Sequence, residues 1–177
     1  VKTALGQVIG ATTVTFDNYE NGKRLVRTYE TNTGDFCADA LYYLFDNMGL
    51  DVDVAIMNGG GIRNKAITGE ISYLTCKDIH TFGNVACLQT VTGQQILDAL
   101  EWGARFCEGA ECGGFLQVSG LIYEINVNAP NTVQSDEKSV WIGGPTGEYR
   151  VKNVMIGGEP LDVNKTYTVA SHNYMLK

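Results

Sequence analysis

The segment NGGGIR, residues 58–63, is the part of the sequence whose residue types point most directly to chemistry. Glycine has no Cβ, so three consecutive glycines can let backbone amides approach a ligand closely. Arg63 then offers a planar guanidinium that can hold an anion through paired hydrogen bonds. The segment lacks the GK[ST] ending of a P-loop, and Asn64 stands where a dinucleotide-binding motif has its third glycine. A ligand-binding loop and a tight structural turn both remain open.

Two aromatic residues stand where a loop is expected. Phe82 precedes a glycine in the stretch TFGN, and Tyr174 follows a predicted strand in the stretch SHNY. A phenylalanine in such a place is more often part of the core. If it is exposed instead, its ring can stack on a nucleobase, which contributes roughly 1–3 kcal/mol per base. Two exposed rings would form a clamp, although spacing along the chain does not show whether they meet.

The residues that could carry hydrolysis are too few and too scattered. His80 and His172 are the two histidines, and they form no Asp-x-His or His-x-His pattern and no Ser-His-Asp relay. Cys76 and His80 lie four residues apart and could share a helix face as metal ligands, which is the weaker alternative. We therefore predict no catalytic residue, no metal site and no cofactor in this chain.

Composition excludes several classes of protein. The 20 acidic and 13 basic residues give a net charge of -7, which argues against the broad basic surface that a nucleic-acid polymer needs. One or two arginines can still hold a small anion. No apolar run reaches the roughly 18 residues of a membrane span. Five cysteines without a CxxC pair make a zinc ribbon unlikely, and Cys107 and Cys112 are left either bridged or free.

The elements that must position these residues alternate between strand and helix in the first part of the chain. Apolar residues from Val8 to Phe16 are spaced as in a strand. From Phe36 to Met48 they recur every four residues, which predicts a helix with Asn32 as a possible N-cap and Gly49 as its end. The apolar run 52–57 then predicts a buried strand that delivers the NGGG loop.

Further along, a short helix over 73–79 and a strand over 85–91 are predicted, and Thr92 with Gln95 forms a capping box for a helix that continues to Ala104. After residue 114 the pattern becomes mainly strands, at 116–118, 121–127, 150–156 and 166–170. The prediction is a single α+β domain over residues 1–177, in which mixed sheets are flanked by helices.

Five segments together closely resemble the C-terminal domain of the 5'-nucleotidase family. The resemblance covers nearly the whole chain in order, and that family joins an N-terminal two-metal phosphoesterase domain to a C-terminal domain that binds the nucleoside. Its members hydrolyse nucleoside monophosphates, UDP-sugars, NAD-type dinucleotides or cyclic nucleotides. The segments are TNTGDFCADAL at 31–41, DVAIMNGGGIR at 53–63, ITGEISYLTCKDIHTFGNVACLQTVTGQQILDALE at 67–101, GGFLQVSGL at 113–121 and YTVASHNYM at 167–175.

The resemblance implies a role for particular residues. Phe82 and Tyr174 fall where the family has the two aromatic walls that enclose the base. Arg63 and Arg27 match arginines on the ribose and phosphate side. The same pocket would also be lined by Asn58, Gly60, Gly61, Asn84 and Gly113.

The resemblance also implies what surrounds this domain. The chain would be the substrate-binding domain, ending before the family's GGDG loop and without the N-terminal metallophosphoesterase domain, which would hold two divalent metal ions. Alone it would be inactive. The expected partners are a small nucleotide or nucleoside and that N-terminal domain, in an extracellular, cell-surface or periplasmic protein. A non-catalytic nucleoside- or carbohydrate-binding surface module is the alternative, and within the hydrolases a 2',3'-cyclic-nucleotide phosphodiesterase or a UDP-sugar hydrolase.

Overall fold

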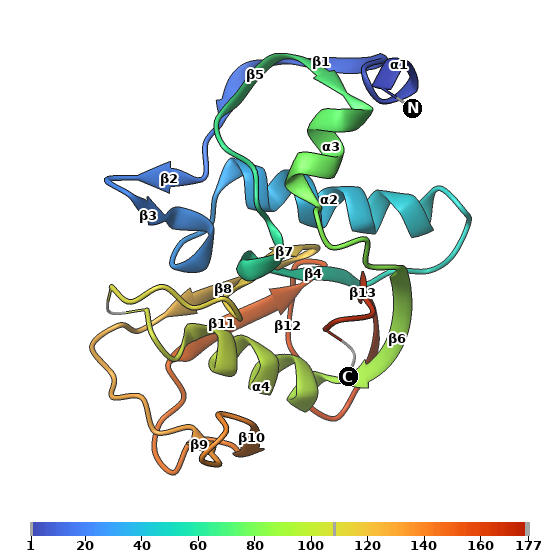
Figure 1. The fold of residues 1–177 in the computed structure, drawn as a ribbon. Helices are drawn as coiled ribbons and strands as arrows, with labels where there is room; N and C mark the ends of the chain where they lie inside the picture. Colours follow the sequence, from blue (N-terminus) through green and yellow to red (C-terminus); the bar gives the residue numbers. More distant parts are fainter. Residues whose placement is uncertain (1, 108, 176–177) are drawn as a thin grey trace.

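A computed structural model describes residues 2–107 and 109–175, with only the backbone described for Lys2 and Thr3 (Figure 1). At its centre lies a four-stranded sheet in the order β6-β13-β4-β7. β13 and β4 are parallel, whereas β6 and β7 run antiparallel to their neighbours. The bounds of these strands are Val54–Asn58 for β4, Ala86–Thr92 for β6, Leu116–Ser119 for β7 and Thr166–His172 for β13.

Both faces of this sheet are covered, because successive strand residues point to opposite sides. Ala55 and Ala170 pack with Phe45 of helix α2 (Asn32–Asp46) on one face. Val54 and Val169, each one residue earlier, belong to the core on the other face. That second core contains helix α4 (Gly93–Ala104).

A second, three-stranded sheet in the order β12-β11-β8 packs against α4 and completes this core. Leu121 and Val151 from this sheet pack against Ile96 and Leu100 of α4. Figure 1 shows α4 lying beside β8 and β11, below the central sheet. The bounds are Leu121–Ile125 for β8, Val151–Ile156 for β11 and Glu159–Pro160 for β12.

The rest of the chain forms smaller elements around this centre. Strand β1 (Val8–Phe16) pairs antiparallel with β5 (Ile67–Ser72) in a two-stranded ribbon at the top of Figure 1. The other elements are α1 (Lys2–Leu5), β2 (Tyr19–Glu20), β3 (Lys23–Arg24), the 3-10 turn η1 (Leu25–Arg27), the 3-10 turn η2 (Gly59–Gly61), α3 (Tyr73–Ile79), β9 (Gln134–Ser135) and β10 (Trp141–Gly143).

The predicted α+β class, with mixed sheets flanked by helices, is confirmed. The capping box at Thr92 is also confirmed, with both Thr92 and Gln95 bonding across the helix start. The N-cap of α2 was predicted one residue late, because Thr31 rather than Asn32 accepts from the Gly34 amide. Asn32 already lies in the helix and donates to the Thr15 carbonyl oxygen at 2.9 Å. The strand β5 was not predicted, since the polar GE pair interrupts its apolar pattern.

The possible disulfide between Cys107 and Cys112 is not formed, because Cys112 carries a free, buried thiol. Within the described residues, no helix combines the length and the apolar composition needed to cross a membrane.

Candidate functional site

The topology brings four loops to one edge of the central sheet. Because β4 and β13 are parallel, their carboxyl ends at Asn58 and His172 lie at the same edge. The antiparallel partners begin there, since His172 pairs with Ala86 of β6 and Asn58 pairs with Leu116 of β7. The loops before β6 and β7 and after β4 and β13 therefore converge.

At this edge lies a cavity of about 480 Å³. Every residue that the sequence assigned to the pocket lines it, with the exception of Arg63. The lining residues are Arg27, Asn58, Gly60, Gly61, Phe82, Asn84, Gly113 and Tyr174. Residues far apart in the sequence thus meet in one cavity.

The two predicted aromatic walls are both on the surface of the protein. Phe82 is 61% exposed and Tyr174 is 60% exposed, so neither is a core residue. Their loops are joined by a reciprocal pair of hydrogen bonds, from the Asn173 amide to the Val85 carbonyl oxygen at 2.9 Å and from the Val85 amide to Asn173 Oδ1 at 3.1 Å. This pair fixes the spacing between the two loops and hence the width of the opening that the rings flank.

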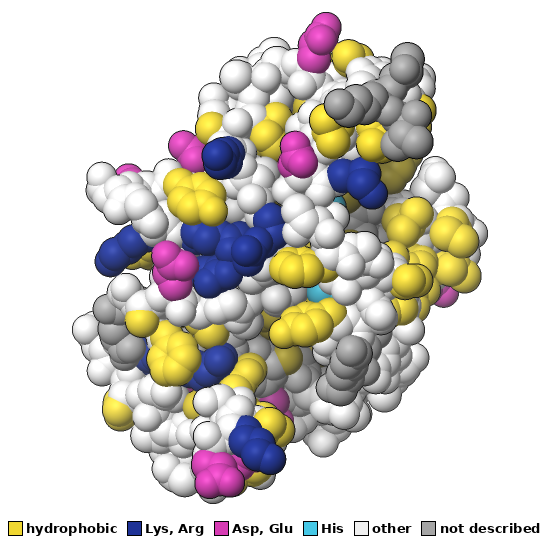
Figure 2. Space-filling model, viewed as in Figure 1, with side chains coloured by type: hydrophobic (Ala, Val, Ile, Leu, Met, Phe, Trp, Pro, Cys, Tyr) yellow, Lys and Arg dark blue, Asp and Glu magenta, His cyan; other side chains and the backbone are white. Residues whose placement is uncertain are grey.

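Three arginines gather beside these rings. Burial, and after it the charges of Arg27 and Arg63, lower the pKa of Arg24. Arg27 lies on the cavity, with its Nη1 3.5 Å from Oε2 of Glu111 and its Nε buried without a hydrogen-bond partner in the described chain. Figure 2 shows Lys and Arg side chains concentrated in the middle of this face, next to hydrophobic side chains. Such a concentration of positive charge favours an anion.

Arg63 is not among the residues that line the cavity. Its guanidinium carbon lies 5.5 Å from the centroid of the Phe82 ring, and its Nη1 donates weakly to the Gly60 carbonyl oxygen at 3.4 Å. The cation-π contact places Arg63 against one face of Phe82. Arg63 therefore supports the ring and contributes charge, instead of lining the pocket as predicted.

The glycine loop uses two of its amides within the protein, as expected for the structural turn, although Gly60 and Gly61 also line the cavity. The Gly59 amide donates to the Phe115 carbonyl oxygen at 2.7 Å, and the Gly60 amide donates to the Gly113 carbonyl oxygen at 2.8 Å. A Cβ added to Gly59 would overlap the Val26 carbonyl oxygen, and one on Gly60 would lie 2.8 Å from that of Gly113. The loop needs glycine because neighbouring backbone packs directly against it.

Gln117 is a positioning residue that the sequence did not reveal. It is 1% exposed, and its Nε2 donates to the carbonyl oxygens of Val26 at 3.1 Å and Tyr29 at 2.6 Å. Its Oε1 accepts from the Thr31 amide at 3.2 Å. One side chain of β7 thereby anchors the segment that carries Arg27. Nothing in a single sequence distinguishes this glutamine from a surface one.

A smaller cavity of about 300 Å³ adjoins the first and shares Gly61, Phe82 and Asn84 with it. His172 and His80 also line it, and burial lowers the pKa of both histidines. From the sequence, His172 was considered only as a metal ligand or catalytic base. The signal in the sequence that could have pointed to a place in the site was its position just after a predicted strand.

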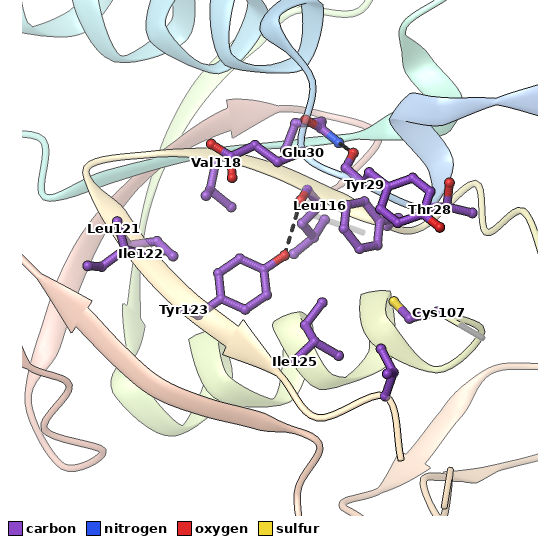
Figure 3. Close-up of a pocket in the computed structure, with 13 residues that line it drawn as sticks. Thr28, Tyr29, Glu30, Cys107, Leu116, Val118, Leu121, Ile122, Tyr123 and Ile125 are labelled. Atoms are coloured by element: carbon purple, nitrogen blue, oxygen red, sulfur yellow. Dashed lines mark hydrogen bonds between the residues drawn. The ribbon is translucent and has the colours of Figure 1, made fainter. Parts of the chain in front are cut away.

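Another cavity of about 300 Å³ lies away from these loops, between β7, β8 and the segment 28–30 (Figure 3). Figure 3 shows Tyr123 reaching into it, with its hydroxyl donating to the Leu116 carbonyl oxygen at 3.4 Å. None of the described residues that line it is Lys, Arg or His. It is therefore a poorer match for an anionic ligand than the cavity at Arg27.

The described residues contain no group of three or more His, Cys, Asp and Glu side chains placed to hold a metal ion. What the cavity offers is binding, through two exposed rings, amide side chains and a nearby cationic patch. Such a site can hold and orient a ligand that has a flat ring at one end and a negative charge at the other.

Comparison with known proteins identifies the family of this chain. The family model described as "5'-nucleotidase, C-terminal domain" matches residues 8–177. The chain belongs to this family. Among curated members, it is 32% identical over 94% of its length to the trifunctional nucleotide phosphoesterase protein YfkN of Bacillus subtilis, and 29% identical over 88% to protein UshA of Escherichia coli.

The structure also resembles a solved member of the 5'-nucleotidase family, the 5'-nucleotidase precursor from Thermus thermophilus. The two superpose with a TM-score of 0.78 at 31% identity over 98% of this chain. The chain spans 10% of YfkN, 23% of UshA and 31% of the Thermus chain. It therefore corresponds to one part of much longer relatives.

Proposed function

We propose that the cavity at the sheet edge binds a nucleotide, with the base between Phe82 and Tyr174 and the ribose and phosphate toward Arg27. The convergence of these three residues, from distant segments, on one cavity carries the proposal. Its volume of about 480 Å³ lies within the roughly 300–1,000 Å³ typical of small-molecule sites.

The rings supply affinity without strong base preference. Each ring is more than half exposed, and stacking on one aromatic side chain is worth roughly 1–3 kcal/mol for any base. Arg27 supplies the anion contact, because its Nε has no partner in the described structure and its contact with Glu111 is long at 3.5 Å. A phosphate can form the shorter, charge-assisted hydrogen bonds that the carboxylate does not.

We further propose that this domain serves as the recognition part of a 5'-nucleotidase-type phosphoesterase that acts outside the cytoplasm. The names of curated relatives support the reaction class, among them YfkN and a 5'-nucleotidase of Vibrio cholerae that is 28% identical over 87% of this chain. A cell wall protein of Listeria monocytogenes, Lmo0130, is 29% identical over 82% of this chain, which supports the location. Hydrolysis would reside in an N-terminal domain with two divalent metal ions, and this chain alone would be inactive.

Binding and hydrolysis on separate domains would require a movement between those domains. If this domain holds the nucleotide and another domain carries the metals, the bound phosphate must be delivered to them by a movement between domains. Residues of this chain would then contribute orientation, through stacking and the Arg27 contact, rather than proton transfer.

Calorimetric titration of the 177-residue chain tests the binding proposal. AMP, adenosine, ribose 5-phosphate and glucose are titrated separately. AMP should bind most tightly, because only AMP occupies both the ring clamp and the arginine patch. Binding of glucose without binding of adenosine would instead favour a carbohydrate-binding module. Phosphate release from AMP with added Mn²⁺ or Zn²⁺ should stay at background, since we expect the metal site in another domain.

A further inference from the structure

We propose that His172 recognises the polar edge of the base, and so determines which bases the clamp accepts. This inference rests on the proposed function, because it assigns a residue to the same ligand. It goes beyond stacking, which tolerates every base. Three features of the imidazole support it: its burial, its lack of partners among the described residues and its place relative to Tyr174.

His172 has unmet hydrogen-bonding capacity inside the protein. Its side chain is 4% exposed, and both Nδ1 and Nε2 are buried without a hydrogen-bond partner among the described residues. Leaving a buried donor or acceptor unpaired is unfavourable, so such groups almost always have a partner. A ligand that reaches the imidazole supplies that partner, which makes His172 a recognition element.

The imidazole lies at the right place for an edge contact. Its ring plane is 24° from that of Tyr174, and the ring centroids are 6.2 Å apart. Rings that are nearly parallel at this separation are offset sideways rather than directly stacked. His172 lines the smaller cavity, which shares Gly61, Phe82 and Asn84 with the cavity that Tyr174 lines, so the imidazole lies next to the slot between the two rings. We expect a base that enters this slot to present its edge to the imidazole.

Histidine side chains reach the surface on this face. Figure 2 shows histidine atoms in a gap between hydrophobic side chains. Tyr174, which is 60% exposed, is the aromatic neighbour of the buried His172 ring.

The protonation state decides what the imidazole can recognise. Burial lowers the pKa of His172, so the ring is neutral near pH 7 and offers one donor and one acceptor. It can pair with either a ring nitrogen or an amino group on a base edge. Asn84, which lines both cavities, offers the same two functions from the opposite loop.

The test compares two nucleosides that stack alike but differ at the edge. Adenosine is compared with benzimidazole riboside, which lacks the amino group and both nitrogens of the six-membered ring. Wild-type chain should prefer adenosine by about 3- to 10-fold in Kd, the worth of one or two recovered hydrogen bonds. His172→Phe keeps a flat ring against Tyr174 and should abolish the preference. His172→Gln, which keeps a donor and an acceptor, should retain part of it.

The outcomes separate this inference from the proposed function. No preference in the wild type, or a preference that survives His172→Phe, overturns the role of His172. Equal weakening of both nucleosides in His172→Phe assigns the histidine a purely structural role, which also overturns it. If instead Phe82→Ala leaves both affinities unchanged, the nucleoside clamp itself is wrong.

Discussion

Replacing Phe82 by alanine should separate an effect on binding from an effect on folding. The ring is 61% exposed, so its removal leaves no hole in the core. Its contact inside the protein is the cation-π pair with Arg63 at 5.5 Å, worth about 0.5–1 kcal/mol at an exposed site. We therefore expect the free energy of unfolding to fall by at most about 1 kcal/mol.

The expected loss of binding is larger. Removing one of two stacking faces should cost roughly 1–3 kcal/mol for any ligand that carries a base. This loss corresponds to an increase in Kd of about 5- to 150-fold. Ribose 5-phosphate, which has no base to stack, should bind the variant and the wild type alike. Phe82→Trp keeps a flat ring and should stay within a few-fold of the wild type.

The assay is isothermal titration of adenosine and ribose 5-phosphate, with urea unfolding of each variant. Phe106→Ala is the matched control, because Phe106 is also exposed, at 44%, contacts an arginine, and does not line the cavity. A folded Phe82→Ala protein that binds adenosine as tightly as the wild type would refute the clamp. Equal losses in Phe82→Ala and Phe106→Ala would show that the effect comes from general destabilisation.

Three further changes give distinct expectations. Arg27→Ala should raise the Kd of AMP by about tenfold and that of adenosine much less, because one charge-assisted contact to phosphate is lost. Titrations of both ligands at low and high salt check this. Gly59→Ala should destabilise the fold by about 1–3 kcal/mol in urea unfolding, since the new methyl overlaps the Val26 carbonyl oxygen, whereas Gly10→Ala, with nothing within 4 Å, should be neutral. Burial lowers the pKa of His172 in the folded protein below its usual 6.5. As the pH drops below about 6.5, His172 therefore takes up a proton in the unfolded chain before it does so in the folded protein, and the free energy of unfolding falls. In His172→Phe this part of the pH dependence should disappear, while the part due to His80 remains. If the free energy of unfolding changes with pH from about 8 to about 5 as in the wild type, this linkage is contradicted.

The residues of the site differ in how far sequence patterns could reveal them. Arg27, Phe82, Tyr174 and their neighbours were found through motifs that resemble a known family, and the structure brings all of them but Arg63 around one cavity. Sequence patterns assigned no role in the site to His172 or Gln117. Both side chains are buried. Gln117 makes hydrogen bonds to a segment distant in the sequence, whereas the two ring nitrogens of His172 have no hydrogen-bond partner among the described residues.

The local sequence by itself determined several of the main elements. Hydrophobic period and capping chemistry act within a few residues, so helix α2, the capping box at Thr92 and the strand before Asn58 could be predicted, although α2 ends at Asp46 and not at Gly49. What only the tertiary structure decided is which loops share an edge and which amides face a ligand. The parallel pairing of β4 with β13 joins residues far apart in the chain, such as Val54 and Val169, and the Gly59 and Gly60 amides turn to carbonyl oxygens of another loop. No local pattern encodes such contacts, because they depend on chain segments that meet only once the sheet has formed.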